Sequence, residues 1–204
     1  TVDSFLEMGN KLFGDLPALP KDKTEIIADL LARLVDAAYQ QDEPTPTMEI
    51  GIRLIPGKAA PAIVRIRRHL TDLAYYREDV HSAAWKNFYQ VDGRVFETLT
   101  QMWQGDETVH TPAELAERLA EYRGYAEADY AAAYEELVSL GWAGLDDGKY
   151  SLTEEGRRIR QEAEDRTDEY FAKPFEILTL DERAELETLM EKLAEVMAVP
   201  DEET

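Results

Sequence analysis

Apolar residues recur at helical spacing along most of the chain, and this pattern predicts a mainly α-helical protein. The spacing and the start and stop signals place helices at about 22–41, 61–88, 95–103, 112–122, 127–140, 153–173 and 179–197. One short stretch has a different pattern. The segments 142–145 and 149–152 flank Asp147-Gly148, a favoured two-residue turn, which predicts a β-hairpin.

Two of the predicted helices are short and follow each other closely. Thr111-Pro112-Ala113-Glu114 is a helix start with a capping box, Gly124 lies in the following turn, and Gly141 ends the second helix. Two short helices joined by a tight Gly-containing turn form a helix-turn-helix. We therefore predict a mainly α winged helix-turn-helix at about 92–170, with a short β-hairpin wing and extra N-terminal helices.

Pro44 and Pro46 cannot continue the first long helix and indicate a linker. We expect an N-terminal helical arm and linker at 1–50 and a winged-helix domain at 51–204, packed as one compact unit. The segment from Phe5 to Leu16 and the last helix, from Leu186 to Met197, both have apolar faces that must be buried. A homodimer is the simplest way to cover them.

Several motifs resemble known regulators. The segment 149–157 (KYSLTEEGR) resembles the strand-to-helix junction of MarR-type winged-helix proteins, with its Leu-Thr-x-x-Gly-Arg sequence. The segment 76–85 (YREDVHSAAW) resembles the Arg-x-Asp-x-His-x-Ala-Ala signature of the SalK-like helix-turn-helix family, and Arg123-Gly124-Tyr125 resembles its Arg-Gly-Trp. The segment 164–168 (EDRTD), followed by Pro174, resembles a third element of that family. These resemblances imply a MarR-like fold, a regulator-like role and dimerisation through terminal helices.

The chain is strongly acidic, with 43 Asp and Glu against 22 Lys and Arg and a net charge of −21. It contains no cysteine, which excludes disulfides, thiolate metal sites and a cysteine nucleophile. No apolar stretch is long enough to span a bilayer and the start lacks a signal-peptide pattern, so we expect a cytoplasmic protein with no membrane partner.

Charge disfavours DNA as a partner of the predicted recognition helix. Residues 127–140 contain four acidic residues and no Lys or Arg, and the wing tip places Asp146 and Asp147 against Lys149 alone. One basic run precedes the module and comprises Arg53, Lys58, Arg65, Arg67 and Arg68, followed by His69. This run is either a helix face paired with acidic side chains or a patch that binds an anion or a partner protein.

Charged residues also fall on predicted inward faces. On the helix at 61–88 the predicted stripe includes Ile63, Ile66, Leu70, Leu73, Ala84 and Phe88, with Arg77 and His81 on the same side. Arg166 lies on the inner side of the later long helix. Buried charges require partners. The candidate binding residues for a small anionic ligand are therefore Arg77, Asp79, His81, Arg166 and Asp168; the alternative is that they form internal salt bridges around a core histidine.

The sequence gives little support for catalysis or metal binding. Glu78-x-x-His81 is half of a di-metal motif, and the second half is missing. There is no Gly-x-Ser-x-Gly and no Gly-rich phosphate loop. We expect no enzyme activity, cofactor or metal. Two functions stay open: a dimeric regulator that senses a small anionic ligand, and a winged-helix module that has lost DNA binding and acts in protein interaction or ligand binding.

Overall fold

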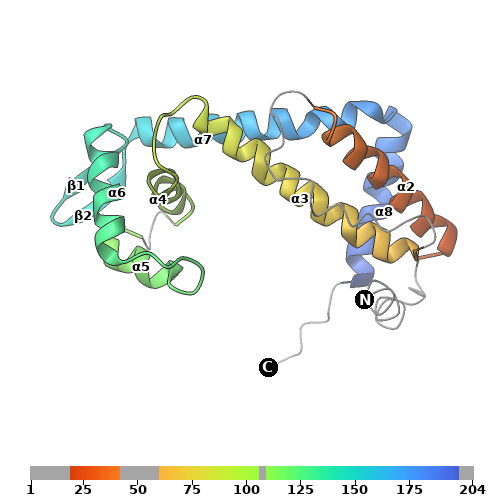
Figure 1. The fold of residues 1–204 in the computed structure, drawn as a ribbon, viewed down its shortest axis with the longest axis horizontal. Coiled ribbons are helices and arrows are strands. Elements are labelled where there is room, and N and C mark those ends of the chain that lie inside the picture. The colour runs from red at the N-terminus through yellow and green to blue at the C-terminus, as the bar shows by residue number, and fades with distance from the viewer. Residues whose placement is uncertain (1–18, 42–59, 106–108, 198–204) are drawn as a thin grey trace. The chain divides into compact units, whose positions relative to one another are not determined.

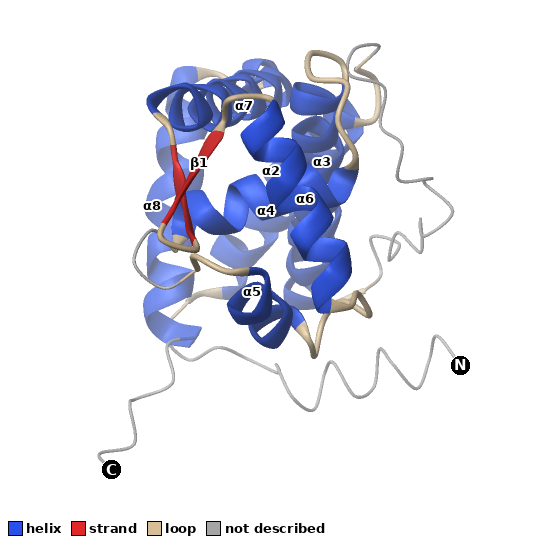
Figure 2. Cartoon of the chain, turned by 90° about the vertical axis from the view of Figure 1, so that its left-hand side faces the viewer, coloured by secondary structure: helices blue, strands red, loops and turns tan. Residues whose placement is uncertain are grey.

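The computed structural model describes residues 19–41, 60–105 and 109–197 and confirms a mainly helical chain (Figure 1). In chain order the elements are α2 (Lys21–Ala38), α3 (Ala62–Lys86), α4 (Gly93–Gln104), α5 (Pro112–Leu119), α6 (Glu127–Ser139), β1 (Ala143–Asp146), β2 (Lys149–Leu152), α7 (Glu154–Ala172), the 3-10 helix η2 (Lys173–Ile177) and α8 (Leu180–Met197). The strands pair as an antiparallel hairpin, drawn in red in Figure 2. The predicted linker at 42–47 and the apolar segment from Phe5 to Leu16 lie outside the described residues.

Contacts divide the chain into two units. Unit 1 combines residues 1–80 with 169–204, and unit 2 comprises residues 81–168. The boundaries fall within α3 and α7. Within unit 1, α2 packs against η2 and α8 from the other end of the chain. The predicted domain boundary at residue 50 lies outside the described residues and stays a prediction.

The core of unit 1 is built from α2, α3, η2 and α8. Leu30, Leu31 and Leu34 of α2 are buried with Leu186, Leu189 and Leu193 of α8. The hydrophobic effect drives this packing, because each helix has one apolar face that water solvates poorly. The apolar face of α8 is thus covered largely within the chain itself.

The buried face of α3 differs in part from the predicted stripe. Ile66, Leu73 and Ala84 are buried as expected, but Leu70 is 37% and Phe88 50% exposed. The buried side of α3 also includes four polar or charged residues, Arg65, His69, Asp72 and Asp79. A hydrophobic pattern cannot detect such positions, so the prediction selected apolar neighbours on an adjacent face instead.

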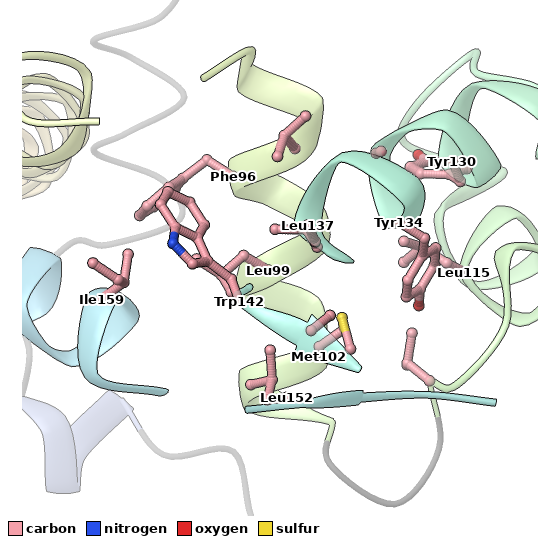
Figure 3. Close-up of a cluster of buried hydrophobic side chains, with 14 of the residues drawn as sticks. Phe96, Leu99, Met102, Leu115, Tyr130, Tyr134, Leu137, Trp142, Leu152 and Ile159 are labelled. Carbon is pink, nitrogen blue, oxygen red and sulfur yellow. The ribbon is translucent and has the colours of Figure 1, made fainter. Parts of the chain in front are cut away.

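The core of unit 2 is aromatic and aliphatic (Figure 3). The buried side chains of α4, α5, α6, the hairpin and α7 that form it include Phe96, Leu99, Met102, Leu115, Tyr130, Tyr134, Leu137, Trp142, Leu152 and Ile159. Trp85 stacks on Phe96 with ring centroids 4.6 Å apart. The spacing of Tyr122 from Leu115 and Leu119 predicts that it is buried on the fourth helix. It is 75% exposed, because α5 ends at Leu119 and Tyr122 lies in the turn beyond it. Leu140 follows Leu137 at helical spacing and is therefore also predicted to point inward, but it is 41% exposed.

Candidate functional site

The short helix α5 begins at the capping box predicted from the sequence. Glu114 accepts hydrogen bonds from the backbone N–H groups of His110 (2.8 Å) and Thr111 (2.9 Å), and the Thr111 hydroxyl accepts one from the N–H of Glu114 (3.3 Å). These donors stabilise the carboxylate and hold the pKa of Glu114 below its usual value. Pro112 occupies the first turn, where its missing N–H has no helical partner to lose.

The helix α6 is held at both ends. At its start Asp129 accepts from the N–H of Ala126 (2.9 Å) and from Arg94 of α4 (2.9 Å). At its end Gly141 has a φ of 76°, and its N–H donates to Val138 while the N–H of Trp142 donates to Leu137. This is a Schellman motif, which favours glycine because side chains disfavour positive φ.

The hairpin follows as the sequence predicts, with β1 shifted by one residue. Ala143 pairs with Leu152 and Asp146 with Lys149, which leaves Asp147-Gly148 as the two-residue loop. Both loop residues have positive φ, 46° and 74°, as a type I′ turn requires.

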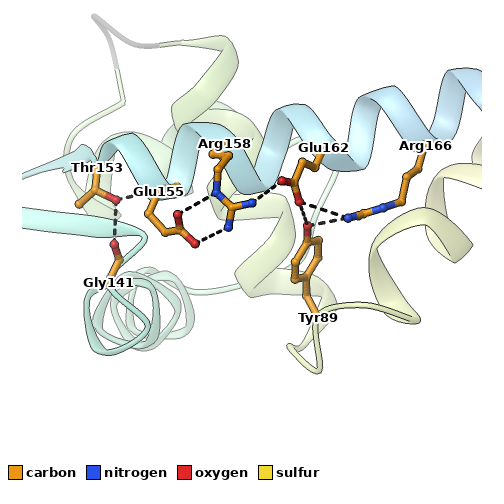
Figure 4. Close-up of polar contacts among 8 residues, drawn as sticks. Tyr89, Gly141, Thr153, Glu155, Arg158, Glu162 and Arg166 are labelled. Carbon is orange, nitrogen blue, oxygen red and sulfur yellow. Dashed lines mark hydrogen bonds and ion pairs between the residues drawn. The ribbon is translucent and has the colours of Figure 1, made fainter.

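The hairpin is joined to α7 through the Leu-Thr-x-x-Gly sequence (Figure 4). The Thr153 hydroxyl donates to the carbonyl of Gly141 (2.7 Å) and accepts from the N–H of Gly156 (3.0 Å). The backbone of α7 passes so close to Trp142 that a Cβ on Gly156 would meet the Trp142 carbonyl. The motif therefore fixes where α7 starts relative to α6 and the hairpin.

Two short helices, a turn and a hairpin in this order agree with the comparison to known families. The sequence model of a Helix-turn-helix family matches residues 5–201. The chain belongs to this family. Neither a curated protein nor a solved structure matches the chain. In the helix-turn-helix, α5 is the first helix and α6 is the second, the position of a recognition helix.

The exposed surface of α6 carries acidic and small apolar side chains. Its exposed positions are Glu127, Ala128, Ala132, Glu135, Glu136, Val138 and Ser139. None of them is one of the residues that read base edges most often, namely Arg, Lys, Asn and Gln. Nearby cations are already engaged: Arg94 pairs with Asp129, and Arg123 pairs with Glu97 at 2.7 Å.

The described part of the predicted basic run lies in unit 1 and is largely paired. Arg65 is buried and forms ion pairs with Glu25 and Asp29 of α2. Arg68 pairs with the buried Asp72 at 2.7 Å, and Arg67 is exposed. Arg53 and Lys58 lie outside the described residues. For Arg65 and Arg68 the pairing with acidic side chains, one of the two interpretations of the run, agrees with these contacts.

Three of the predicted ligand residues, His81, Arg166 and Asp168, belong to unit 2. His81 Nδ1 lies 3.0 Å from the hydroxyl of Thr167, and its ring lies 6.0 Å from Phe96. Arg166 donates to the Tyr89 hydroxyl (3.2 Å), to Glu162 (3.2 Å) and to the carbonyl of Ala84 (3.3 Å), as Figure 4 shows in part. Its guanidinium also lies 4.0 Å from the ring centre of Phe88. Asp168 is exposed.

The network around Arg166 shifts two pKa values. Burial raises the pKa of Tyr89, and the hydrogen bond that Tyr89 donates is the main reason that the pKa of Glu162 is lowered. Both shifts keep the pair in the protonation states that the hydrogen bonds need: a neutral phenol and a carboxylate. These contacts agree with the alternative of internal interactions in unit 2, and a ligand-binding role for Arg166 and His81 stays a prediction.

The remaining two predicted ligand residues belong to unit 1. Asp79 is buried, and Arg77 lines an apolar groove together with Arg183. The five predicted ligand residues are divided between the two units. That they bind one ligand together stays a prediction. Arg183 and the aromatic residues of the groove were not predicted, because no sequence signal brings α2, α3, η2 and α8 together.

Within residues 19–41, 60–105 and 109–197, no three His, Asp or Glu side chains gather as metal ligands would. Among the helices of those segments, none combines the length and apolar character needed to cross a membrane.

Proposed function

We propose that this protein is a regulator-like winged-helix protein whose helix-turn-helix contacts another protein and not the major groove of DNA. The order of α5, α6, hairpin and α7 supports the winged-helix part of this proposal. The observation that carries the proposal is the absence of any cation on α6 beside three exposed glutamates.

Electrostatics argue against duplex binding by this face. Binding to DNA gains most of its non-specific affinity from Lys and Arg that neutralise phosphates and release counterions. Residues 111–153, the helix-turn-helix with its hairpin, carry nine acidic side chains and three basic ones. Every acidic side chain near the phosphate backbone would oppose binding.

Apolar exposure supports a protein partner. Val138 and Leu140 at the end of α6 are 37% and 41% exposed, and Leu145 of the hairpin is 55% exposed. Acidic residues lie beside them in the sequence, at Glu135, Glu136 and Asp146. Apolar surface bordered by charge is typical of protein interfaces. A complementary partner would present apolar residues flanked by Lys or Arg.

The test has two arms. In the first, the full chain is titrated against a fluorescent random-sequence duplex at about 50 mM salt, where non-specific binding is strong. We expect no saturable binding up to about 10⁻⁵ M protein. Family membership supports the alternative, a duplex reader. Salt-dependent binding that weakens in Lys149→Gln would establish that alternative.

The second arm identifies the partner surface. A photo-crosslinker is placed at Val138, with Glu117 of α5 as the control position. A partner captured at Val138 supports the proposal if Val138→Asp weakens its binding at least tenfold while Glu117→Gln leaves it unchanged. Equal binding by both variants would contradict a contact through α6.

We further propose a homodimer that senses a small anionic ligand. Ile177 and Leu180, at the junction of η2 and α8, are 50% and 81% exposed and offer apolar surface for a second copy. Light scattering should give twice the chain mass of 23.2 kDa. A monomer at micromolar concentration would refute the dimer.

A further inference from the structure

Unit 1 contains a groove that has no role in the helix-turn-helix. Its volume is about 520 Å³, within the range of small-molecule sites. Four elements form it, α2, α3, α8 and the segment from the end of α7 into η2. Its walls are almost entirely apolar, and the residues that build them include Leu31, Leu73, Phe171, Phe175, Leu186 and Met190.

Three charged residues lie among the groove residues: Arg77, Arg183 and Glu187. The formal charges of these three lining residues sum to +1, in a chain whose overall charge is −21. Arg183 is oriented from within the unit, since its Nε donates to the carbonyl of Leu178 at 3.2 Å. A guanidinium has five N–H donors in a fixed plane, so each arginine can bind a carboxylate alongside its contacts within the chain.

We propose that this groove binds an amphipathic monocarboxylate, with its hydrocarbon part on the apolar walls and its carboxylate on Arg77 and Arg183. Apolar burial supplies most of the affinity of such a ligand, and the single negative charge matches the net charge of the groove. A neutral amphiphile lacks the ion pair, and a cationic one would be repelled by the arginines.

The proposal that the groove binds a monocarboxylate rests only on the ligand-sensing part of the proposed function. It assigns a location and a ligand class to that part. It lies in unit 1, whereas the DNA and crosslinking tests concern α6 of unit 2. A negative result in the groove experiments therefore does not contradict the proposal for α6, and a negative result for α6 does not contradict the groove.

The first experiment measures binding of dodecanoate to the full chain by displacement of a fluorescent dansyl fatty acid, below the micellar concentration. We expect saturable binding, with dodecanol and dodecyltrimethylammonium at least about tenfold weaker. Arg77→Gln should weaken dodecanoate at least about tenfold, whereas the matched control Arg67→Gln, on the same helix but outside the groove, should bind like the original chain. Absence of binding, or equal affinity for dodecanoate and dodecanol, would overturn the proposal.

A second variant tests the groove independently, because a folding defect in Arg77→Gln would also weaken binding. Ala74 is an exposed groove residue, so Ala74→Phe should fill the groove without disturbing the core. We expect it to abolish dodecanoate binding and to leave the melting temperature within a few degrees of the original. Unchanged affinity in a folded Ala74→Phe chain would place the ligand elsewhere and overturn the proposal.

Because the chain has no cysteine, single thiols can locate the ligand. Dodecanoate should slow alkylation of a Met190→Cys thiol in the groove and leave that of Thr188→Cys, an exposed neighbour on α8, unaffected. Equal rates at Met190→Cys with and without dodecanoate would refute the site. If alkylation of the ligand-free variant instead slowed as protein concentration rose, the groove would belong to a second copy, and the proposal would fail.

Discussion

A Cβ atom on Gly156 would lie 2.0 Å from the carbonyl oxygen of Trp142, far inside van der Waals contact. The two backbones approach this closely because Thr153 ties the end of α6 to the first turn of α7. Gly156→Ala should therefore force the segments apart and lower the free energy of unfolding by about 1–3 kcal/mol, the usual range for overpacking. Urea denaturation followed by tryptophan fluorescence measures the change.

Gly144 provides the matched control for that substitution. A Cβ there meets nothing within 4 Å, and its φ is not positive. Gly144→Ala should change the free energy of unfolding by less than about 0.5 kcal/mol. Equal effects of the two substitutions would show that the contact with Trp142 does not constrain the fold.

Glycine is required at the end of α6 because of its backbone conformation, and not because a side chain would lack space there. Gly141 has a φ of 76°, and a Cβ there would meet nothing within 4 Å. Gly141→Ala should cost about 1 kcal/mol, because alanine disfavours positive φ. Gly93→Ala, in open space at ordinary φ, should be neutral or stabilise α4 by about 0.5 kcal/mol in the same denaturation assay. A neutral Gly141→Ala would contradict the Schellman assignment.

His69 should make the stability of the chain depend on pH. Burial lowers its pKa, although Asp72 and Asp36 raise it; Arg65 and Arg68 lower it further. As the pH falls below about 6.5, the unfolded chain binds the proton first. The free energy of unfolding should then decrease until the pH reaches the lower pKa of the folded state. Above about pH 6.5 the protonation of His69 should not change the free energy of unfolding.

Urea denaturation at a series of pH values between about 7 and 5 measures this dependence. The decrease should largely disappear in His69→Gln and persist in His110→Gln. An identical decrease in the original chain and in His69→Gln would assign it to other groups.

Arg166 should contribute to stability more than its neighbour Arg158. Arg166 is 23% exposed and holds the Tyr89 hydroxyl and Glu162 together, whereas Arg158 is 51% exposed. Arg166→Ala should lower the free energy of unfolding by about 1–3 kcal/mol, since it removes a half-buried guanidinium that donates to Tyr89, Glu162 and the carbonyl of Ala84. Arg158→Ala should have no measurable effect, because exposed ion pairs contribute little. Thermal denaturation by circular dichroism compares the two, and a larger loss for Arg158→Ala would contradict the structural role of Arg166.

Local signals predicted the elements of unit 2 well. The capping box at Thr111, the stop at Gly141 and the Asp147-Gly148 turn each depend on a few consecutive residues, and all three are present in the structure. Predictions of which face of a helix is buried were less accurate. Leu70, Phe88 and Tyr122 were expected to be buried and are exposed, because polar His69, Asp72 and Asp79 take part in the buried face of α3 and because α5 is shorter than its apolar pattern.

The sequence alone determined the helix-turn-helix, its hairpin and the acidic character of α6, because turns, caps and charge are encoded by residue type at short range. The tertiary structure decided which charges are paired and where apolar surface stays open. The pairing of Arg65 with Glu25 and Asp29, and the groove that brings Arg77 near Phe171 and Arg183, join residues far apart in the chain. Such long-range juxtapositions come from the packing of whole helices, and no local pattern specifies them.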